Sequence, residues 1–135
     1  MNKSEYQENL GLIKNVFLGR EGHDIFTMTI DLDYDNGLSQ SVGFYALDTP
    51  LKIDGKFVKR IGTAEGMQFI INVIDTVGVN AYHELNGKYV WVLFDKDDVS
   101  IGWGSPSRPV GLRGFKKRET FIFQDIFNEE LNVND

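Results

Sequence analysis

The stretch His23–Asp48, which reads HDIFTMTIDLDYDNGLSQSVGFYALD, decides the fold. From Phe26 to Tyr34, apolar or aromatic side chains occupy every second position, and threonines and aspartates lie between them. A period of two is typical of a β-strand with one face on a core and the other in water. The pattern predicts four buried residues: Phe26, Met28, Ile30 and Leu32. It predicts three exposed ones: Thr27, Thr29 and Asp31.

A turn and a returning strand complete this stretch as a β-hairpin. Asp35-Asn36-Gly37 interrupts the alternation with residues that tolerate positive φ. Leu38–Leu47 is the expected return strand, and Gly43 within it indicates a β-bulge or a close approach of another backbone.

The flanking segments predict further short elements. Ser4–Asn9 has the spacing of a capping box and could form one helical turn, and Leu12–Leu18 is the expected first strand. After the central hairpin, Asp54-Gly55 marks the turn of a second, weaker hairpin over Thr49–Arg60.

One segment has the signals of a helix. Thr63 is the expected N-cap and Gly78 the expected C-cap. Between them a set of apolar residues with helical spacing predicts a core-facing stripe, which Phe69 and Val73 widen. The stripe consists of Met67, Ile70, Ile71, Ile74 and Val77.

The rest of the chain predicts mainly strands. Lys88–Phe94 is apolar on both faces, which indicates a central strand. The other expected elements are a short helical turn at Ala81–Leu85, preceded by Asn80 as its cap, strands at Val99–Trp103 and Thr120–Phe123, and a short C-terminal helix at Gln124–Leu131. The order of elements predicts a single α+β domain over residues 1–135, an antiparallel β-sheet packed against one main helix.

Composition narrows the classes of function. The chain has 135 residues, 41% of them hydrophobic, a net charge of −6 and no cysteine. Without cysteine there is no disulfide, thiolate metal site or cysteine nucleophile. The acidic balance disfavours non-specific binding to DNA, and the N-terminal residues contain no apolar run long enough for a signal peptide or a membrane span. We therefore expect a cytoplasmic protein without a membrane association.

One segment of the chain is basic, although the protein as a whole is acidic. Residues 105–120 contain a single acid, Glu119, and are rich in glycine and proline, which predicts a long basic loop. Such a loop can contact a partner, or it can simply be a solvated loop that offsets the acidic body. Its basic residues are Arg108, Arg113, Lys116, Lys117 and Arg118.

Three aspartates on the central hairpin resemble the start of a calcium loop. Asp31, Asp33 and Asp35 have D-x-D-x-D spacing, but Gly37 stands at the seventh place of the loop and Val42 at the twelfth. A calcium-binding EF-hand loop requires glycine at about the sixth place and a bidentate glutamate at about the twelfth. We expect no metal here, and instead an exposed acidic face.

Motifs of catalysis and cofactor binding are not found. His23 and His83 are far apart in the chain and lack ligand spacing, and no serine stands in a nucleophile elbow. The glycine-rich stretches match neither a phosphate-binding loop nor a dinucleotide fingerprint. The sequence therefore favours a protein that is not an enzyme and needs no cofactor.

Four stretches resemble a family of small bacteriophage and prophage proteins. They are LGREGHDIFTMTIDLDY, GFYALDTP, RIGTAEGMQFIINVIDTVGV and ELNGKYVWV, and together they lie between Leu18 and Val92. They are similar to the family pattern L-G-x-E-x-H-G-I, L-D-Y-G-G, Q-x-F-G-G-Y-x-L-D, G-T-A-x-G, V-G-V and L-x-G-K. Two glycine pairs of that pattern differ here, at Asp35-Asn36 and at Val42–Tyr45. The resemblance implies a phage accessory protein, not a particular reaction.

Two hypotheses of function follow. In the first, the protein binds and inhibits a host macromolecule, as an anti-CRISPR or other anti-defence inhibitor of a nuclease or nucleoprotein complex. Its expected contact residues are Asp31, Asp33 and Asp35 together with Arg108, Arg113, Lys116, Lys117 and Arg118. In the second, the hairpin binds a small ligand, a nucleotide or a metabolite. The expected ligand residues are His23, Asp33, Tyr34, Gln40, Tyr45 and Asp48.

Overall fold

The protein is an α+β domain in which one main helix packs on an antiparallel sheet. The computed structural model describes residues 6–96, 108–116 and 119–127. A six-stranded sheet has the order β3-β2-β1-β6-β7-β8, and a separate two-stranded sheet consists of β4 and β5. The strands are β1 (Tyr6–Glu21), β2 (Ile25–Tyr34), β3 (Ser39–Ala46), β4 (Asp48–Ile53), β5 (Lys56–Gly62), β6 (Tyr89–Asp95), β7 (Gly111–Gly114) and β8 (Thr120–Ile122).

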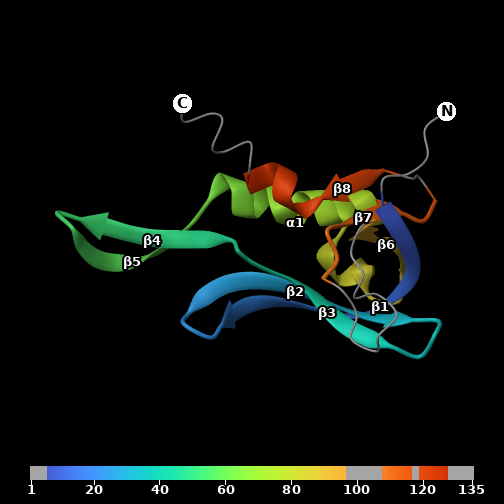
Figure 1. Cartoon of the computed structure of the whole chain (residues 1–135). Coiled ribbons are helices and arrows are strands. Elements are labelled where there is room, and N and C mark those ends of the chain that lie inside the picture. Colours follow the sequence, from blue (N-terminus) through green and yellow to red (C-terminus); the bar gives the residue numbers. More distant parts are fainter. Residues whose placement is uncertain (1–5, 97–107, 117–118, 128–135) are drawn as a thin grey trace.

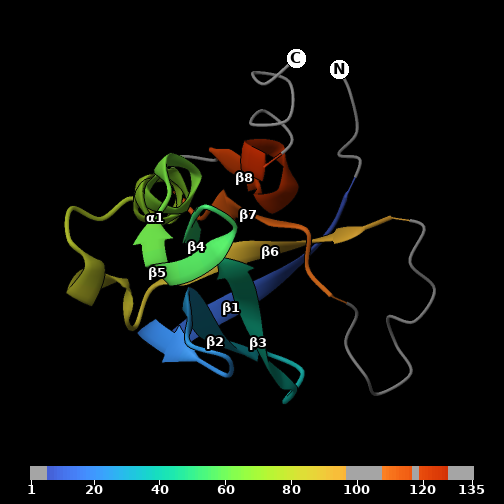
Figure 2. The same ribbon diagram turned by 90° about the vertical axis from the view of Figure 1, so that its left-hand side faces the viewer.

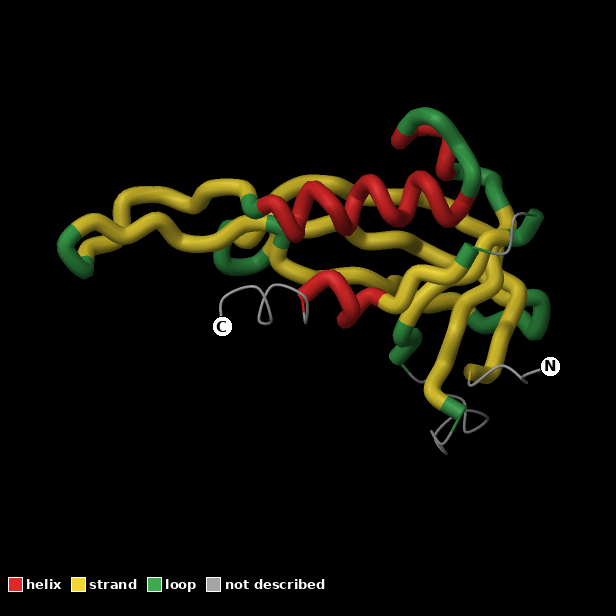
Figure 3. Tube along the Cα trace, turned by 90° about the horizontal axis from the view of Figure 1, so that it is seen from above, coloured by secondary structure: helices red, strands yellow, loops and turns green. Residues whose placement is uncertain are grey.

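Helix α1 (Ala64–Val77) lies across one face of the large sheet (Figures 1 and 2). A helical segment at residues 123–127 lies beside it, and a short 3-10 helix, η1 (Tyr82–Leu85), follows it. Figure 3 shows that β4 and β5 form an arm that extends beyond the N-terminal end of α1. The expected α+β architecture is therefore confirmed. The expected strand Val99–Trp103 lies outside the described residues.

Strand β1 is longer than the sequence predicts, and it organises the sheet. It has 16 residues, of which the first part pairs with β6 and the second with β2. Residues 6–9 are strand, so the expected helical turn at Ser4–Asn9 is wrong there. The reason is non-local: the backbone groups of this segment pair with β6, from Tyr6 opposite Asp95 to Asn9 opposite Val92, far along the chain.

The central hairpin has the predicted register on one face and not on the other. Met28, Ile30 and Leu32 are fully buried, and Phe26 is half-buried. Thr27 and Thr29, however, are buried, and Asp31 is half-buried, so the expected exposure of all three is wrong. Strand β2 lies between β1 and β3, and residues of β3 cover its polar side chains: the Thr27 hydroxyl donates to the Tyr45 backbone carbonyl, and Asp31 accepts from the Ser41 hydroxyl.

The local signals of α1 are correct, and its predicted buried face is correct in part: Ile70, Ile74 and Val77 are partly buried against the core. The Thr63 side chain accepts a hydrogen bond from the Gly66 backbone N–H at 2.9 Å, and Gly78 ends the helix with φ +91°. The residues of α1 that are buried are Gly66, Phe69, Val73 and Thr76. Met67 is 58% exposed and Ile71 40% exposed, so the predicted stripe is wrong at these two positions.

A close contact at Gly66 sets the rotation of the helix. A Cβ on Gly66 would lie 2.2 Å from the Leu47 carbonyl oxygen, so only glycine permits this approach. The contact turns Phe69 and Val73 toward the core. Phe69 packs there against Phe121 and Phe123, with ring centroids 5.4 and 5.6 Å away.

Two other short helical segments differ in detail from the sequence. The turn at Ala81–Leu85 is the 3-10 helix η1, and the Glu84 carboxylate, not Asn80, caps it by accepting hydrogen bonds from the backbone N–H groups of Asn80 and Ala81. The C-terminal helix is described only at residues 123–127, where Phe127 stacks on Tyr45 at 5.1 Å.

Candidate binding surfaces

The acidic residues of the central hairpin are held by neighbouring strands. The Ser41 hydroxyl donates to Asp31, and the Ser39 hydroxyl donates to Asp33, each at 2.6 Å. Lys14 of β1 also lies 3.5 Å from the Asp33 carboxylate. Asp35 is exposed in the turn after β2. Within the described part of the chain, no group of three histidine or acidic residues could hold a metal ion.

The basic segment is not one loop. Gly111–Gly114 forms β7, which pairs with β6 and β8. Arg113 forms an ion pair with Glu8 of β1 and donates from Nε to the Thr120 hydroxyl at 3.0 Å. The prediction of a continuous basic loop is therefore wrong at β7, because strand pairing holds this segment in the sheet.

The other basic residues of this segment lie before and after β7 in the sequence. Arg108 lies beside Tyr45, on the other side of β7 in sequence from Lys116. Lys116 is exposed in the turn after β7. Lys117 and Arg118 lie outside the described residues.

The six expected ligand residues do not meet in one pocket. Tyr34 is buried, which raises the pKa of its hydroxyl, and it donates to the side-chain oxygen of Gln40. His23 is exposed in the turn between β1 and β2. Asp48 pairs with Arg60 at the start of the arm. Only Gln40 and Tyr45 line the same pocket.

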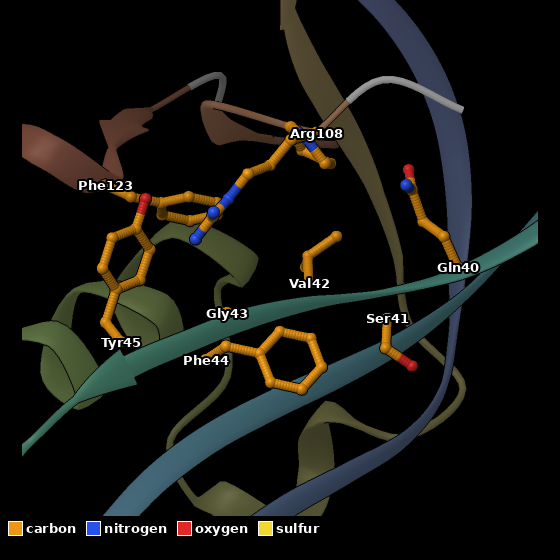
Figure 4. Close-up of a pocket in the computed structure, with 9 residues that line it drawn as sticks. Gln40, Ser41, Val42, Gly43, Phe44, Tyr45, Arg108 and Phe123 are labelled. Atoms are coloured by element: carbon orange, nitrogen blue, oxygen red, sulfur yellow. The ribbon is translucent and has the colours of Figure 1, made fainter. Parts of the chain in front are cut away.

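That pocket lies at a β-bulge in β3, and Figure 4 shows its lining. Gly43 has φ +110°, and a Cβ there would lie 2.3 Å from the Met28 carbonyl oxygen. The bulge that the sequence predicts at Gly43 is therefore confirmed. Phe44 follows it with φ +68° and is 54% exposed. The Arg108 guanidinium lies 5.6 Å from the centre of the Tyr45 ring, which is a cation–π contact.

A second feature, which we call the arm, consists of β4 and β5. Its turn lies at the predicted residues, with φ +53° at Asp54 and +80° at Gly55. Large apolar side chains of the arm are exposed to solvent: Ile53 57%, Phe57 61%, Val58 49% and Ile61 37%. Four basic residues lie among them, Lys52, Lys56, Lys59 and Arg60, against two acids, Asp54 in the turn and Asp48, which is paired with Arg60.

A groove of about 280 Å³ lies where the arm leaves the body. Its apolar lining comes from the central hairpin and from α1, and includes Phe26, Leu47, Met67 and Ile70. Arg20, Asp48 and Arg60 supply its charged groups.

Asp48 anchors the arm beside this groove. Its carboxylate accepts a hydrogen bond from the Arg60 guanidinium at 2.9 Å and another from the Phe26 backbone N–H at 3.2 Å. The hydrogen bond from Arg60 is the main reason that the pKa of Asp48 is lowered, and it outweighs the opposing effect of burial. The pKa of Arg60 is raised by the same bond.

Sequence reasoning predicted the hairpin at Thr49–Arg60 but did not identify it as a binding surface. The sequence does carry a signal for such a surface. In LKIDGKFVKR, apolar and basic residues are mixed, and no regular alternation over both strands places the apolar residues on one buried face. A strand pair of this composition has no core-facing side.

Among the described residues, no helix is long and apolar enough to cross a membrane. No family model, curated protein or solved structure matches this chain.

Proposed function

We propose that this protein acts by binding a macromolecular partner, and that the arm and the adjoining groove form the contact surface. The observation that carries the proposal is the exposure of Ile53, Phe57 and Val58 on a strand pair that projects from the body (Figure 3). A two-stranded hairpin on its own is marginally stable in water, and exposed apolar groups are costly to keep. Contact with a partner would remove these side chains from water.

The arm and the groove form a continuous surface. Asp48, Pro50 and Lys52 alternate along β4, so their side chains lie on one face. Asp48 lines the groove, and Phe57 of β5 pairs with Lys52. The face that begins at the groove therefore continues along the arm to Phe57.

The chemistry of this surface favours a protein partner with an apolar pocket and an acidic rim. Phe57 and Met67 would fill apolar space, and aromatic side chains commonly dominate binding energy. Lys52, which lies opposite Phe57, would face carboxylates, which assist association and orientation. The acidic body, by contrast, repels a nucleic acid over distances up to about one Debye length, roughly 8 Å at physiological salt.

The resemblance to phage proteins supports a host partner. A phage accessory protein that binds a host macromolecule would act as an inhibitor, and a CRISPR nuclease or another defence complex is the partner class we propose. In this proposal the arm is the principal contact, and the acidic face is a secondary one.

The test compares Phe57→Ala with a matched control, Phe44→Gly, in capture from a host lysate that contains a CRISPR system. Both variants remove an exposed phenyl ring, but Phe44 lies on β3, away from the arm. We expect wild type and Phe44→Gly to retain the same defence complex, and Phe57→Ala to bind it about thirtyfold more weakly. Lys52→Glu should slow association and change its salt dependence.

Equal affinity of Phe57→Ala and wild type for the captured complex would exclude the arm as the contact surface. Capture of free nucleic acid in place of a protein, with the same dependence on Phe57, would contradict the choice of partner. Unchanged phage resistance in hosts that express the protein would argue against inhibition of host defence.

A further inference from the structure

The bulge in β3 holds an aromatic ring in solvent at a conformational cost. Phe44 has a backbone φ of +68°. Residues other than glycine rarely adopt this left-handed conformation, which costs about 1–2 kcal/mol. More than half of the surface of Phe44 is nevertheless exposed, so core packing does not account for its position. Strained residues of this kind are concentrated at functional sites.

Among the residues that the structure describes, Arg108 at the same pocket has no carboxylate partner. In the described part of the chain Arg108 forms no ion pair, and its guanidinium rests against the Tyr45 ring. Arginine is suited to phosphate because its planar fork can donate two parallel hydrogen bonds. The cation–π contact orients the guanidinium without using its hydrogen-bonding capacity.

The pocket between these groups has a volume of about 290 Å³. Its lining includes Val42 and Gly43, which precede the bulge, together with Phe44, Tyr45 and Arg108 (Figure 4). This size is at the lower end of the range for small-molecule sites. Among the described residues, the lining combines aromatic rings with one cation, which fits a planar, negatively charged ligand.

From this geometry we infer that the bulge pocket binds a mononucleotide. Its base would stack on Phe44, and its phosphate would accept hydrogen bonds from Arg108. Stacking of a base on an aromatic side chain contributes about 1–3 kcal/mol and tolerates different bases. The inference does not depend on the arm, because Phe57 and the groove residues lie outside this pocket.

The experiment is calorimetric titration of the purified full chain with AMP, GMP, CMP and UMP. Inorganic phosphate and adenosine serve as probes of the two halves of the ligand. We expect at least one mononucleotide to bind more tightly than either half alone. Arg108→Gln should weaken this binding about tenfold, whereas Lys116→Gln, which removes an exposed cation elsewhere, should not change it.

Phe44→Gly separates binding from stability. Glycine adopts the backbone angle of this position freely, so the variant should melt at or above the wild-type temperature while it loses the stacking contribution. Phe57→Ala should bind nucleotide as wild type does. The absence of binding for all four mononucleotides at millimolar concentration would overturn the inference, and so would equal affinity in Arg108→Gln and wild type.

Discussion

Single residues determine how closely the elements of this protein approach one another. Gly66 is the clearest case, because a Cβ atom there would lie only 2.2 Å from the backbone carbonyl oxygen of Leu47. Gly43 has the same role on β3, against the Met28 carbonyl. At both positions the requirement is tertiary, and neither glycine can be replaced without displacement of a neighbouring backbone.

Gly66→Ala tests this requirement. In an isolated helix the change would stabilise by about 1 kcal/mol, since alanine has the higher helix propensity. Here we expect the opposite, a loss of about 2 kcal/mol or more in the free energy of unfolding in urea, because overpacking forces the helix away from Leu47. Gly62→Ala is the control, since a Cβ there meets no atom within 4 Å. A stabilised Gly66→Ala variant would contradict the contact.

Asp48→Asn tests the anchor of the arm through its pH dependence. The lowered pKa of Asp48 means that the ionised form stabilises the folded state. This contribution is complete above about pH 4, the ordinary carboxyl pKa, and is lost as the pH falls through the lower folded-state value.

We therefore expect Asp48→Asn to lower the melting temperature at pH 7 by a few degrees, and the difference from wild type to shrink as the pH is taken well below 4. Asp33→Asn is the control, because the Lys14 side chain that faces Asp33 is 58% exposed and the pair should add little. If the melting temperatures of Asp48→Asn and wild type differ by the same amount at neutral and at strongly acidic pH, the role of the Asp48 charge is refuted.

At the scale of elements, β7 shows how strand pairing overrides composition. Its residues belong to a stretch rich in glycine, proline and positive charge, yet they pair with β6 over Gly111–Gly114. Arg113 is thereby placed opposite Trp91, with its guanidinium on Glu8 of β1. The ion pair joins the two strands that flank β6.

Charge reversal distinguishes the structural from the exposed basic residues of this stretch. Arg113→Glu should lower the melting temperature clearly, since its side chain is only 14% exposed and the change places a carboxylate beside Glu8. Lys116→Glu should leave the melting temperature nearly unchanged, because exposed substitutions alter stability by about 0.5 kcal/mol or less. Equal melting temperatures of the two variants, measured by calorimetry, would refute this assignment.

At the scale of the whole molecule, the two proposed binding sites lie on different parts of the fold. The arm extends from the N-terminal end of α1, and the bulge pocket lies on β3 beside the segment that leads into β7 (Figures 1 and 4). The core beneath both is shared: Phe69, Tyr45 and Phe123 are mutual neighbours. A partner on the arm and a nucleotide in the pocket could therefore bind at the same time.

The sequence by itself determined the features that depend on neighbouring residues. The alternation along β2 predicted its core face, Asp54-Gly55 predicted the arm's turn, and Thr63 and Gly78 predicted the ends of α1. Each of these signals acts within a few positions, through backbone conformation or a capping hydrogen bond, so the chain carries it before any tertiary contact forms.

The tertiary structure alone decided the rest. The rotation of α1 depends on its contact with Leu47, and the extended conformation of residues 6–9 depends on β6. The approach of Arg108 to Tyr45 depends on the bulge and on the path of the chain into β7. In each case the deciding partner lies far away in sequence, and it is the packing or hydrogen bonding with that partner that selects one local conformation among several that the residues permit.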